Sequence, residues 1–383
     1  MDAAEWKETR IRLTPTFTSG KIKMMIPLVQ SVSEQMITEI NKLAEKDADI
    51  DIKEVTTSFT INTLANCALG IETKSGNDIF TEMTKKHFYP TDCGGILRFT
   101  LMNRFPELCG KLGLPFVSKE TADFFRKIFR DSMNYRDESG ISRPDFLELL
   151  IKLKNQSRNT PKPLSDDYLT AQVFLFFIAS LDTSSSAISF ALYELANNPD
   201  MQERTREEMI QVFEKHNDQI TSNCLKEMKY LNQVINETLR LYPSVTNLER
   251  RCVRNYKIAG TELIVERGVY ITIPLYGIHR DPDFYQDPER FDPDKFNERN
   301  KKYIKSQTYF PFGLGPRNCV GNRFGIMVTQ VALIEVLRMF RISMSSSTIL
   351  PFEMDKQTLI LVLKNPILLK AEKIDNECDN LMI

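Results

Sequence analysis

One cysteine stands where its chemistry is usable. Cys319 closes the glycine-rich stretch YFPFGLGPRNC, and an apolar helix is predicted directly after it, over residues 321–340. The positive end of a helix dipole and its free N–H groups favour thiolate, the form of cysteine that binds metals. Gly313, Gly315 and Gly321 carry no Cβ atom, so a flat ligand can lie close to their backbone.

Two further side chains of this stretch suit a flat, partly anionic ligand. Arg317 stands two residues before the sulfur and can reach an anionic edge, and Phe312 supplies an aromatic wall. Taken alone, these residues leave three other interpretations open: a phosphate-binding loop, a redox-sensing cysteine, or a buried cysteine before a core helix. Pro316 removes an N–H donor and no GK[ST] follows, which argues against the first. A redox sensor needs neither the glycines nor Arg317.

Composition limits the class of protein. The 383 residues are 42% hydrophobic and 26% charged, and 50 Lys+Arg against 51 Asp+Glu leave a net charge of -1. These values indicate a folded globular protein and exclude disorder, and the charge balance gives no sign of nucleic-acid binding. Seven cysteines without a CxxC pair favour a reducing compartment over a disulfide framework or a zinc ribbon. His87, His216 and His279 are too dispersed to predict a metal site.

Apolar periodicity predicts a mainly α fold with small β-sheets. Helices are expected over residues 27–47, 53–69, 118–135, 144–155, 166–196, 200–215, 224–241 and 321–340. Short β-rich runs broken by Gly260 and Gly268 predict hairpin strands over 253–273, and residues 348–370 repeat that signature.

The expected helix over 166–196 is unusually apolar. From Tyr168 to Leu181 it runs for 14 residues without a charge, and Asp182 then interrupts it, followed by Thr183. A membrane-spanning helix needs roughly 20 apolar residues. We therefore expect a long helix that crosses the interior of a soluble domain.

The spacing Phe312-x-x-Gly315-x-Arg317-x-Cys319-x-Gly321 matches in full the haem-binding signature of the cytochrome P-450 family, which this chain resembles. In that family the cysteine is the thiolate ligand of haem iron and favours O–O bond cleavage. The resemblance implies that Cys319 ligates the iron, that Arg317 contacts a haem propionate, and that Phe312 packs near the sulfur.

A second pattern is Glu237-x-x-Arg240 within NQVINETLRLYPS. At this spacing an ion pair is routine on a helix surface, but the apolar neighbours indicate a buried pair, which needs a further partner. The family has such a pair, and its third member comes from a later loop. DPERFDP resembles that loop, with Arg290 as the partner. The resemblance makes this triad structural, not catalytic.

The third pattern is the polar break Asp182-Thr183. It resembles the acid–threonine pair that the family carries over the distal face of its haem. Reduction of dioxygen needs protons, and a hydroxyl with a carboxylate can relay them. The alternative is that the hydroxyl run bends its own helix. Ser180 follows Ala179 where the family usually has glycine, which narrows the expected groove.

Two further matches concern the haem propionates. Trp6 and Arg10 match a W-x-x-x-R pair whose side chains reach the propionates in the family, and Arg250 matches another propionate partner. The alternative for the first two is an ordinary amphipathic turn. The resemblance extends from Trp6 to Leu369, and residues 13–25 and 190–204 are most similar to the insect detoxification branch.

The resemblance implies one cytochrome P-450 domain over residues 1–383, without the N-terminal membrane anchor, first helices, sheet strands and substrate loop with which family chains begin. It implies a haem-thiolate monooxygenase with haem b, acting on apolar xenobiotics or endogenous lipids at the cytosolic face of the endoplasmic reticulum membrane. NADPH electrons would arrive through NADPH–cytochrome P-450 reductase, with cytochrome b-five as a second donor.

Two surfaces follow as expectations from the same resemblance. Lys7, Arg10, Arg12 and Arg323 would form a basic docking face, and residues 174–177 and 244–248 would contact substrate. Two alternatives remain: a truncated product that binds haem poorly or not at all, and a haem-thiolate isomerase, against which Asp182-Thr183 argues.

Overall fold

The computed structural model describes residues 3–72, 84, 101–102, 105–115, 117–355 and 360–374. Contacts between residues divide the chain into two compact units. Unit 1 consists of Met1–Met36 and Thr57–Asp182, and unit 2 of Ile37–Thr56 and Thr183–Ile383. Three helices contribute residues to both units: α3 (Ile26–Ala44), α4 (Ile52–Leu64) and α10 (Asp166–Asn197).

Unit 1 is helical throughout its described part. Beside its shares of α3, α4 and α10 it contains α1 (Ala3–Leu13), η1 (Thr14–Phe17), α2 (Ser19–Lys23), the π-helical turn η2 (Ala65–Leu69), α7 (Pro106–Lys111), α8 (Lys119–Ser139) and α9 (Phe146–Ser157). Phenylalanines fill its core: Phe146 stacks on Phe176 with ring centroids 4.8 Å apart, and Phe125 meets Phe177 edge to face at 5.5 Å. These aromatic pairs join helices that are distant in sequence.

Unit 2 contains the sheets and the remaining helices. They are β1 (Ile50–Asp51), α11 (Pro199–Lys215), α12 (Ser222–Glu227), α13 (Lys229–Leu241), β2 (Leu248–Arg251), β3 (Tyr256–Lys257), β4 (Ile264–Val265), β5 (Tyr270–Ile273), α14 (Leu275–Ile278), η3 (Pro293–Phe296), η4 (Lys301–Tyr303), α15 (Asn322–Met339), β6 (Phe340–Met344) and β7 (Leu368–Lys373). The predicted mainly α fold with small β-sheets is confirmed.

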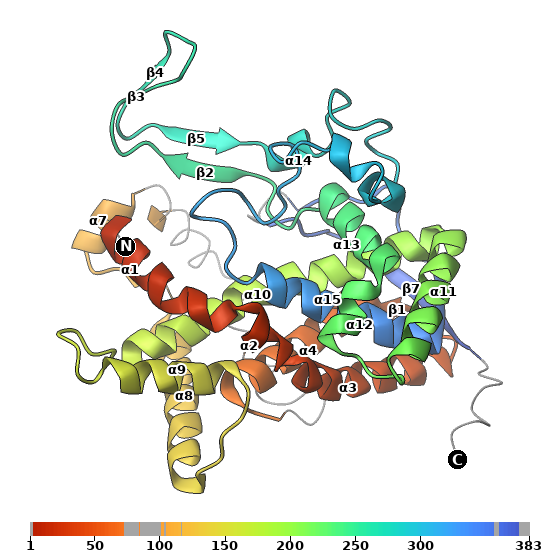
Figure 1. Ribbon diagram of the computed structural model, residues 1–383, viewed down its shortest axis with the longest axis horizontal. Coiled ribbons are helices and arrows are strands. Elements are labelled where there is room, and N and C mark those ends of the chain that lie inside the picture. The colour runs from red at the N-terminus through yellow and green to blue at the C-terminus, as the bar shows by residue number, and fades with distance from the viewer. Residues whose placement is uncertain are drawn as a thin grey trace. The chain divides into compact units, whose positions relative to one another are not determined.

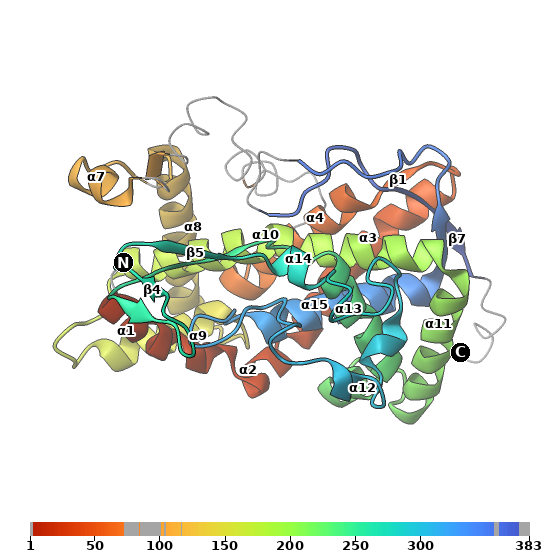
Figure 2. The same ribbon diagram turned by 90° about the horizontal axis from the view of Figure 1, so that it is seen from above.

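Helix α15 is the buried axis of unit 2, with α11 and α13 beside it (Figures 1 and 2). Its last carbonyl groups need partners because a helix leaves them without intrahelical donors. Arg206 on α11 supplies one at Leu337, to whose carbonyl its Nε donates at 3.0 Å, and its Nη2 donates at 3.0 Å to the carbonyl of Phe340, the first residue of β6. The C-terminal end of α15 is thereby fixed, and its other end follows Cys319.

The single helix expected over 224–241 is wrong at one point, because α12 ends at Glu227 and α13 begins at Lys229. The cause lies in another helix. The Glu208 carboxylate of α11 accepts from the N–H groups of Tyr230 and Leu231 at 2.7 and 2.9 Å and so caps α13. The Asn232 amide donates to the Leu225 and Met228 carbonyls, which closes α12.

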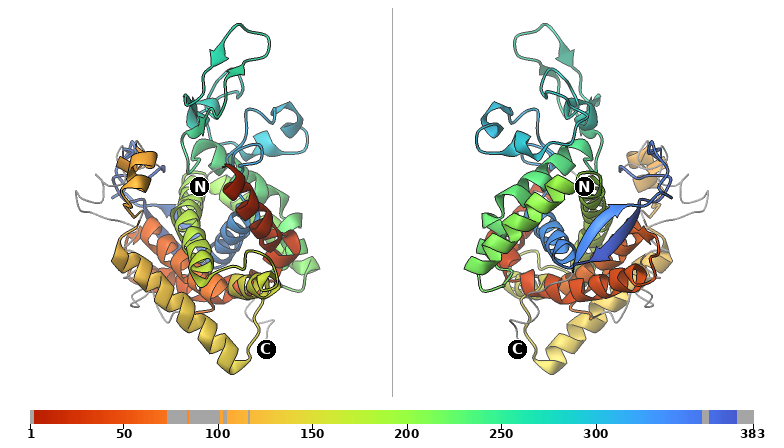
Figure 3. Two further views of the ribbon diagram at one scale, coloured as in Figure 1. Left: turned by 90° about the vertical axis from the view of Figure 1, so that its left-hand side faces the viewer. Right: turned by 90° about the vertical axis from the view of Figure 1, so that its right-hand side faces the viewer.

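All strand pairs among the described residues are antiparallel. β7 pairs with β1 on one side and β6 on the other, and the two longer strands are the blue arrows in the right-hand view of Figure 3. β2 pairs with β5, and β3 with β4, in one projecting ribbon (Figure 1). The hairpin predicted over 253–273 is therefore present. In the tail, Met354 bridges to Leu363 and β7 begins at Leu368; residues 356–359 lie outside the described part.

By length and composition, α10 is apolar enough to cross a membrane, and it is the one such helix among the described residues. In the structure, 61% of its most apolar window is buried. Buried central helices of soluble domains meet the same two criteria.

Candidate functional site

The loop before α15 is held by its backbone. The Gly313 N–H donates to the Phe310 carbonyl at 2.8 Å, and the Cys319 N–H donates to the Phe312 carbonyl at 2.8 Å. Gly313 and Gly315 have φ values of 73° and 77°, a conformation that side chains with a Cβ atom adopt rarely. The glycines are therefore required by the path of the loop.

The side chains of this loop differ in exposure. Cys319 is exposed and not in a disulfide, Arg317 is exposed, and Phe312 is half-buried. A Cβ atom built on Gly315 or Gly321 would meet nothing within 4 Å, so the space beside both glycines is open. The loop thus combines an exposed thiol with two glycine positions beside which the space is open.

Strand β2 lies against the loop. A Cβ atom on Gly313 would be 3.8 Å from Leu248 Cδ1, and Arg250 stands two residues farther along the same strand, opposite Ile271 of β5. The half-buried Arg250 donates from Nη1 to the carbonyl of Glu249 at 2.9 Å. The structure therefore brings the strand of Arg250 to the loop of Cys319.

Asp182 and Thr183 are consecutive, half-buried residues in the middle of α10. The Thr183 carbonyl accepts from the Ser244 hydroxyl at 3.3 Å. One residue on, Ser184 Oγ would lie 4.0 Å from a Cβ atom on Gly325, in the first turn of α15. Within unit 2, Thr183 is thus next to a close approach between α10 and the helix that follows Cys319.

Trp6 and Arg10 both lie on α1 in unit 1, one helical turn apart, and both are half-buried. Their spacing puts them on one face of the helix. Arg12 of the same helix forms an ion pair with Glu8 at 2.7 Å, whereas Lys7 is exposed. Arg323, the fourth residue of the expected docking face, is exposed at the start of α15 in unit 2.

The segments expected to contact substrate differ in exposure. Phe176 and Phe177 are 7% and 0% exposed and fill the aromatic core of unit 1, whereas Leu175 is 54% exposed. Residues 244–248 pass from a half-buried turn into β2.

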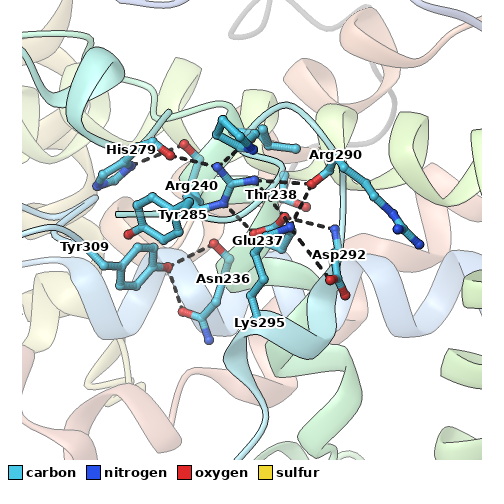
Figure 4. A network of polar contacts seen from close by, with 12 residues as sticks. Asn236, Glu237, Thr238, Arg240, His279, Tyr285, Arg290, Asp292, Lys295 and Tyr309 are labelled. Atoms are coloured by element: carbon cyan, nitrogen blue, oxygen red, sulfur yellow. Dashed lines mark hydrogen bonds and ion pairs between the residues drawn. The ribbon is translucent and has the colours of Figure 1, made fainter. Parts of the chain in front are cut away.

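Figure 4 shows the network around Glu237 and Arg240, both of which have side chains with 0% exposure. Arg240 donates from Nε and Nη2 to the two Glu237 oxygens at 2.7 and 2.8 Å. Its other N–H groups reach the carbonyls of His279 at 2.7 Å, Pro288 at 2.8 Å and Arg290 at 3.4 Å. All five guanidinium donors therefore have acceptors, which is the condition for burying such a charge.

Arg290 joins this network by its main chain. Its carbonyl accepts from Arg240, while its own side chain is exposed and points away in Figure 4. The second cation beside Glu237 is Lys295, whose Nζ lies 3.4 Å from Glu237 Oε1. The loop DPERFDP does supply further partners, the carbonyls of Pro288 and Arg290, whereas the second side-chain cation is Lys295, which lies two residues beyond that loop in η3.

The sequence alone did not single out His279. It is fully buried, its Nδ1 lies 3.2 Å from the Arg240 carbonyl, and its Nε2 accepts from the Phe310 N–H at 3.1 Å. Burial lowers the pKa of His279 to about 4, and the positive charge of Arg240 adds to this. Tyr285 and Tyr309 complete the network; burial raises the pKa of Tyr285 to about 12. The sequence feature that could have identified His279 is its position directly before the segment RDPD, residues 280–283.

The donor set suits haem held by one sulfur. Within the described residues no three His, Cys, Asp or Glu side chains gather around a metal position, so a multi-ligand protein site is absent there. His87 lies outside those residues. An exposed thiol in a loop with two open glycine positions fits a flat macrocycle that brings its own four nitrogen ligands.

Comparisons with known proteins identify one family over nearly the whole chain. A family model described as "Cytochrome P450" matches residues 1–371. "Cytochrome P450 6a2" of Drosophila melanogaster is 38% identical over 387 residues, covering 98% of this chain and 76% of that protein. "Cytochrome P450 6k1" of Blattella germanica is 39% identical over 384 residues, covering 94% of this chain and 72% of that protein. Both relatives come from insects, in agreement with the expected branch.

Proposed function

This chain belongs to the cytochrome P-450 family and is a haem-thiolate monooxygenase, and from that premise we propose that Cys319 is the axial ligand of its haem iron. The observation that carries the proposal is the loop geometry, which exposes one thiol while the backbone on both sides is hydrogen-bonded. Haem held by a thiolate supplies a redox-active iron and the electron donation that favours O–O bond cleavage.

Other residues would hold the same group. We propose that Arg317 and Arg250 bind its propionates and that Phe312 packs beside the sulfur. Arg250 is supported by the contact between its strand and the cysteine loop. Trp6 and Arg10 are proposed as further propionate partners because they share one face of α1.

Asp182 and Thr183 are proposed to deliver protons while dioxygen is reduced. Their half-burial in the middle of α10 supports this role, since a relay needs access both to water and to a dry interior. The approach of α10 to α15 beside Thr183 supports it as well. If the relay operates, Thr183→Ala releases hydrogen peroxide instead of product at unchanged electron consumption. Coupling equal to that of the native chain would reject this role.

For partners and place we propose NADPH–cytochrome P-450 reductase as electron donor, with cytochrome b-five as a second one, at the cytosolic face of the endoplasmic reticulum membrane. None of the five cysteines of the described residues is in a disulfide, as is usual in a reducing compartment. Substrates are proposed to be apolar small molecules, either xenobiotics or endogenous lipids.

A carbon monoxide difference spectrum of the reduced chain tests the central proposal. We expect a Soret band at the thiolate position. A band at the position of neutral thiol ligation, or no band at all, would overturn the proposed role of Cys319.

A further inference from the structure

His279 connects two parts of unit 2 that the sequence separates. On one side its Nδ1 reaches the Arg240 carbonyl at the end of α13, and on the other its Nε2 reaches the Phe310 N–H at the start of the cysteine loop. A carbonyl only accepts and an amide N–H only donates. The hydrogen must therefore sit on Nδ1, and Nε2 must present its lone pair.

The Arg240 side of this connection is rigid. Arg240 returns a hydrogen bond from Nη1 to the His279 carbonyl at 2.7 Å, so each residue binds the main chain of the other. Arg240 is itself fixed by Glu237 and by two loop carbonyls. Burial and the nearby Arg240 and Arg280 charges keep the imidazole neutral, with a pKa of about 4.

The cysteine side continues through backbone hydrogen bonds. Phe310, whose N–H is held by His279, accepts from the Gly313 N–H, and Phe312 accepts from the Cys319 N–H, both at 2.8 Å. The imidazole also stacks on Tyr309 with centroids 5.4 Å apart, and the Tyr309 hydroxyl donates to Asn236 on α13. The two residues that open the loop are thus both tied to α13.

We propose that His279 is a positioning residue for Cys319: its neutral imidazole transmits the fixed position of the Glu237–Arg240 pair to the Phe310 backbone and so sets where the cysteine loop begins. The proposal rests on the proposed role of Cys319 as haem ligand. It assigns to His279 no contact with cofactor or substrate.

Two amide substitutions separate the two hydrogen bonds of the ring. In His279→Gln the amide lies near the former Nε2 and can accept from Phe310, whereas in His279→Asn it lies near Nδ1 and can donate to the Arg240 carbonyl. His279→Phe removes both and keeps the planar ring. His216→Gln serves as the matched control, because His216 pairs with Glu227 outside this network.

We expect His279→Gln to behave like the native chain in two measurements. His279→Asn and His279→Phe should differ from the native chain in both. Hydrogen exchange of the Phe310 amide in the chain as purified should become about tenfold faster, as loss of one hydrogen bond allows. In the haem-loaded, reduced and carbon monoxide-bound protein, the thiolate band should lose about half or more of its share to the neutral-thiol form, while His216→Gln stays native.

The opposite pattern, with asparagine native and glutamine impaired, would overturn the proposal and assign His279 to support of Arg240 alone. So would native behaviour of all three variants, or global unfolding of all three by circular dichroism, because the effect must be local. Should the native chain itself give no thiolate band, the proposed function fails, yet exchange of the Phe310 amide still decides the role of His279.

Discussion

The Glu237–Arg240 network and the cysteine loop lie in the same unit and hold their polar groups in opposite ways. In the network the side chains are buried, and all five guanidinium N–H groups have protein acceptors. In the loop, backbone hydrogen bonds hold Gly313 and Cys319, and the side chains of Arg317 and Cys319 are exposed. A network whose donors are saturated by the protein supports structure, whereas a loop that fixes its backbone and presents its side chains is suited to a ligand.

Cys319→Ala should give the largest effect and concerns function alone. We expect complete loss of the thiolate carbon monoxide band, while the free energy of unfolding of the haem-free chain changes by less than about 0.5 kcal/mol because the thiol is exposed. Cys252→Ala is the control: this half-buried thiol donates to the Arg254 carbonyl at 2.8 Å and should leave the band intact. A band that survives in Cys319→Ala would mean that another residue ligates the iron.

Arg240→Ala should show the reverse, a large cost in stability. It leaves the Glu237 carboxylate buried without its main partner, and removing one member of a buried ion pair costs about 3–5 kcal/mol. Arg204→Ala breaks the pair with Asp294, in which Arg204 is 52% exposed, and should cost no more than about 1 kcal/mol. Urea unfolding measures both. If both variants lose the same free energy of unfolding, the buried network contributes no more to stability than an exposed ion pair does.

Glu194 on α10 is a buried carboxylate that accepts a hydrogen bond from a neutral donor, the Tyr242 hydroxyl, and not from an arginine. Burial raises its pKa to about 7, against the opposing effect of the Tyr242 hydroxyl, which donates at 2.5 Å. The unfolded chain ionises near 4.5, so the folded state binds the extra proton between these values. The free energy of unfolding should therefore fall as pH rises from about 4.5 to about 7, and stay level above.

Glu194→Gln removes this dependence. We expect the free energy of unfolding of the variant to exceed that of the native chain by about 3 kcal/mol at about pH 8 and to equal it at about pH 4, measured by denaturant titration. Glu194→Asp keeps the titrating group and should keep the slope. The same slope in Glu194→Gln would assign it to another residue.

Arg290→Ala should have the smallest effect and sharpens the view of the network. Because Arg290 contributes its carbonyl and its side chain is exposed, we expect a change within about 0.5 kcal/mol. Lys295→Met removes the cation 3.4 Å from Glu237 and should cost about 1–3 kcal/mol. If thermal unfolding shows a larger loss of stability for Arg290→Ala than for Lys295→Met, the Arg290 guanidinium is the third member of the triad after all.

The cysteine loop was predictable because its information is local. One short segment contains the glycines at positive φ, the thiol before a helix and the arginine two residues before that thiol. They can therefore be recognised together in the sequence. Helix periodicity is local in the same sense. The predicted helix over 321–340 corresponds to α15, and the mainly α class follows from such segments.

The sequence by itself thus determined the fold class, the family and the group of residues that suits a haem. Tertiary structure alone decided which partners complete the buried network. Arg240 binds main-chain carbonyl groups 39 to 50 positions away, and because every residue has such a carbonyl, the residue types in the sequence do not show which ones are used. Tertiary structure also decided the break before α13, where a carboxylate from α11 replaces a local cap. His279 belongs to this second class: its role arises from two main-chain groups, 39 and 31 residues distant, that only the folded chain brings to opposite sides of one ring.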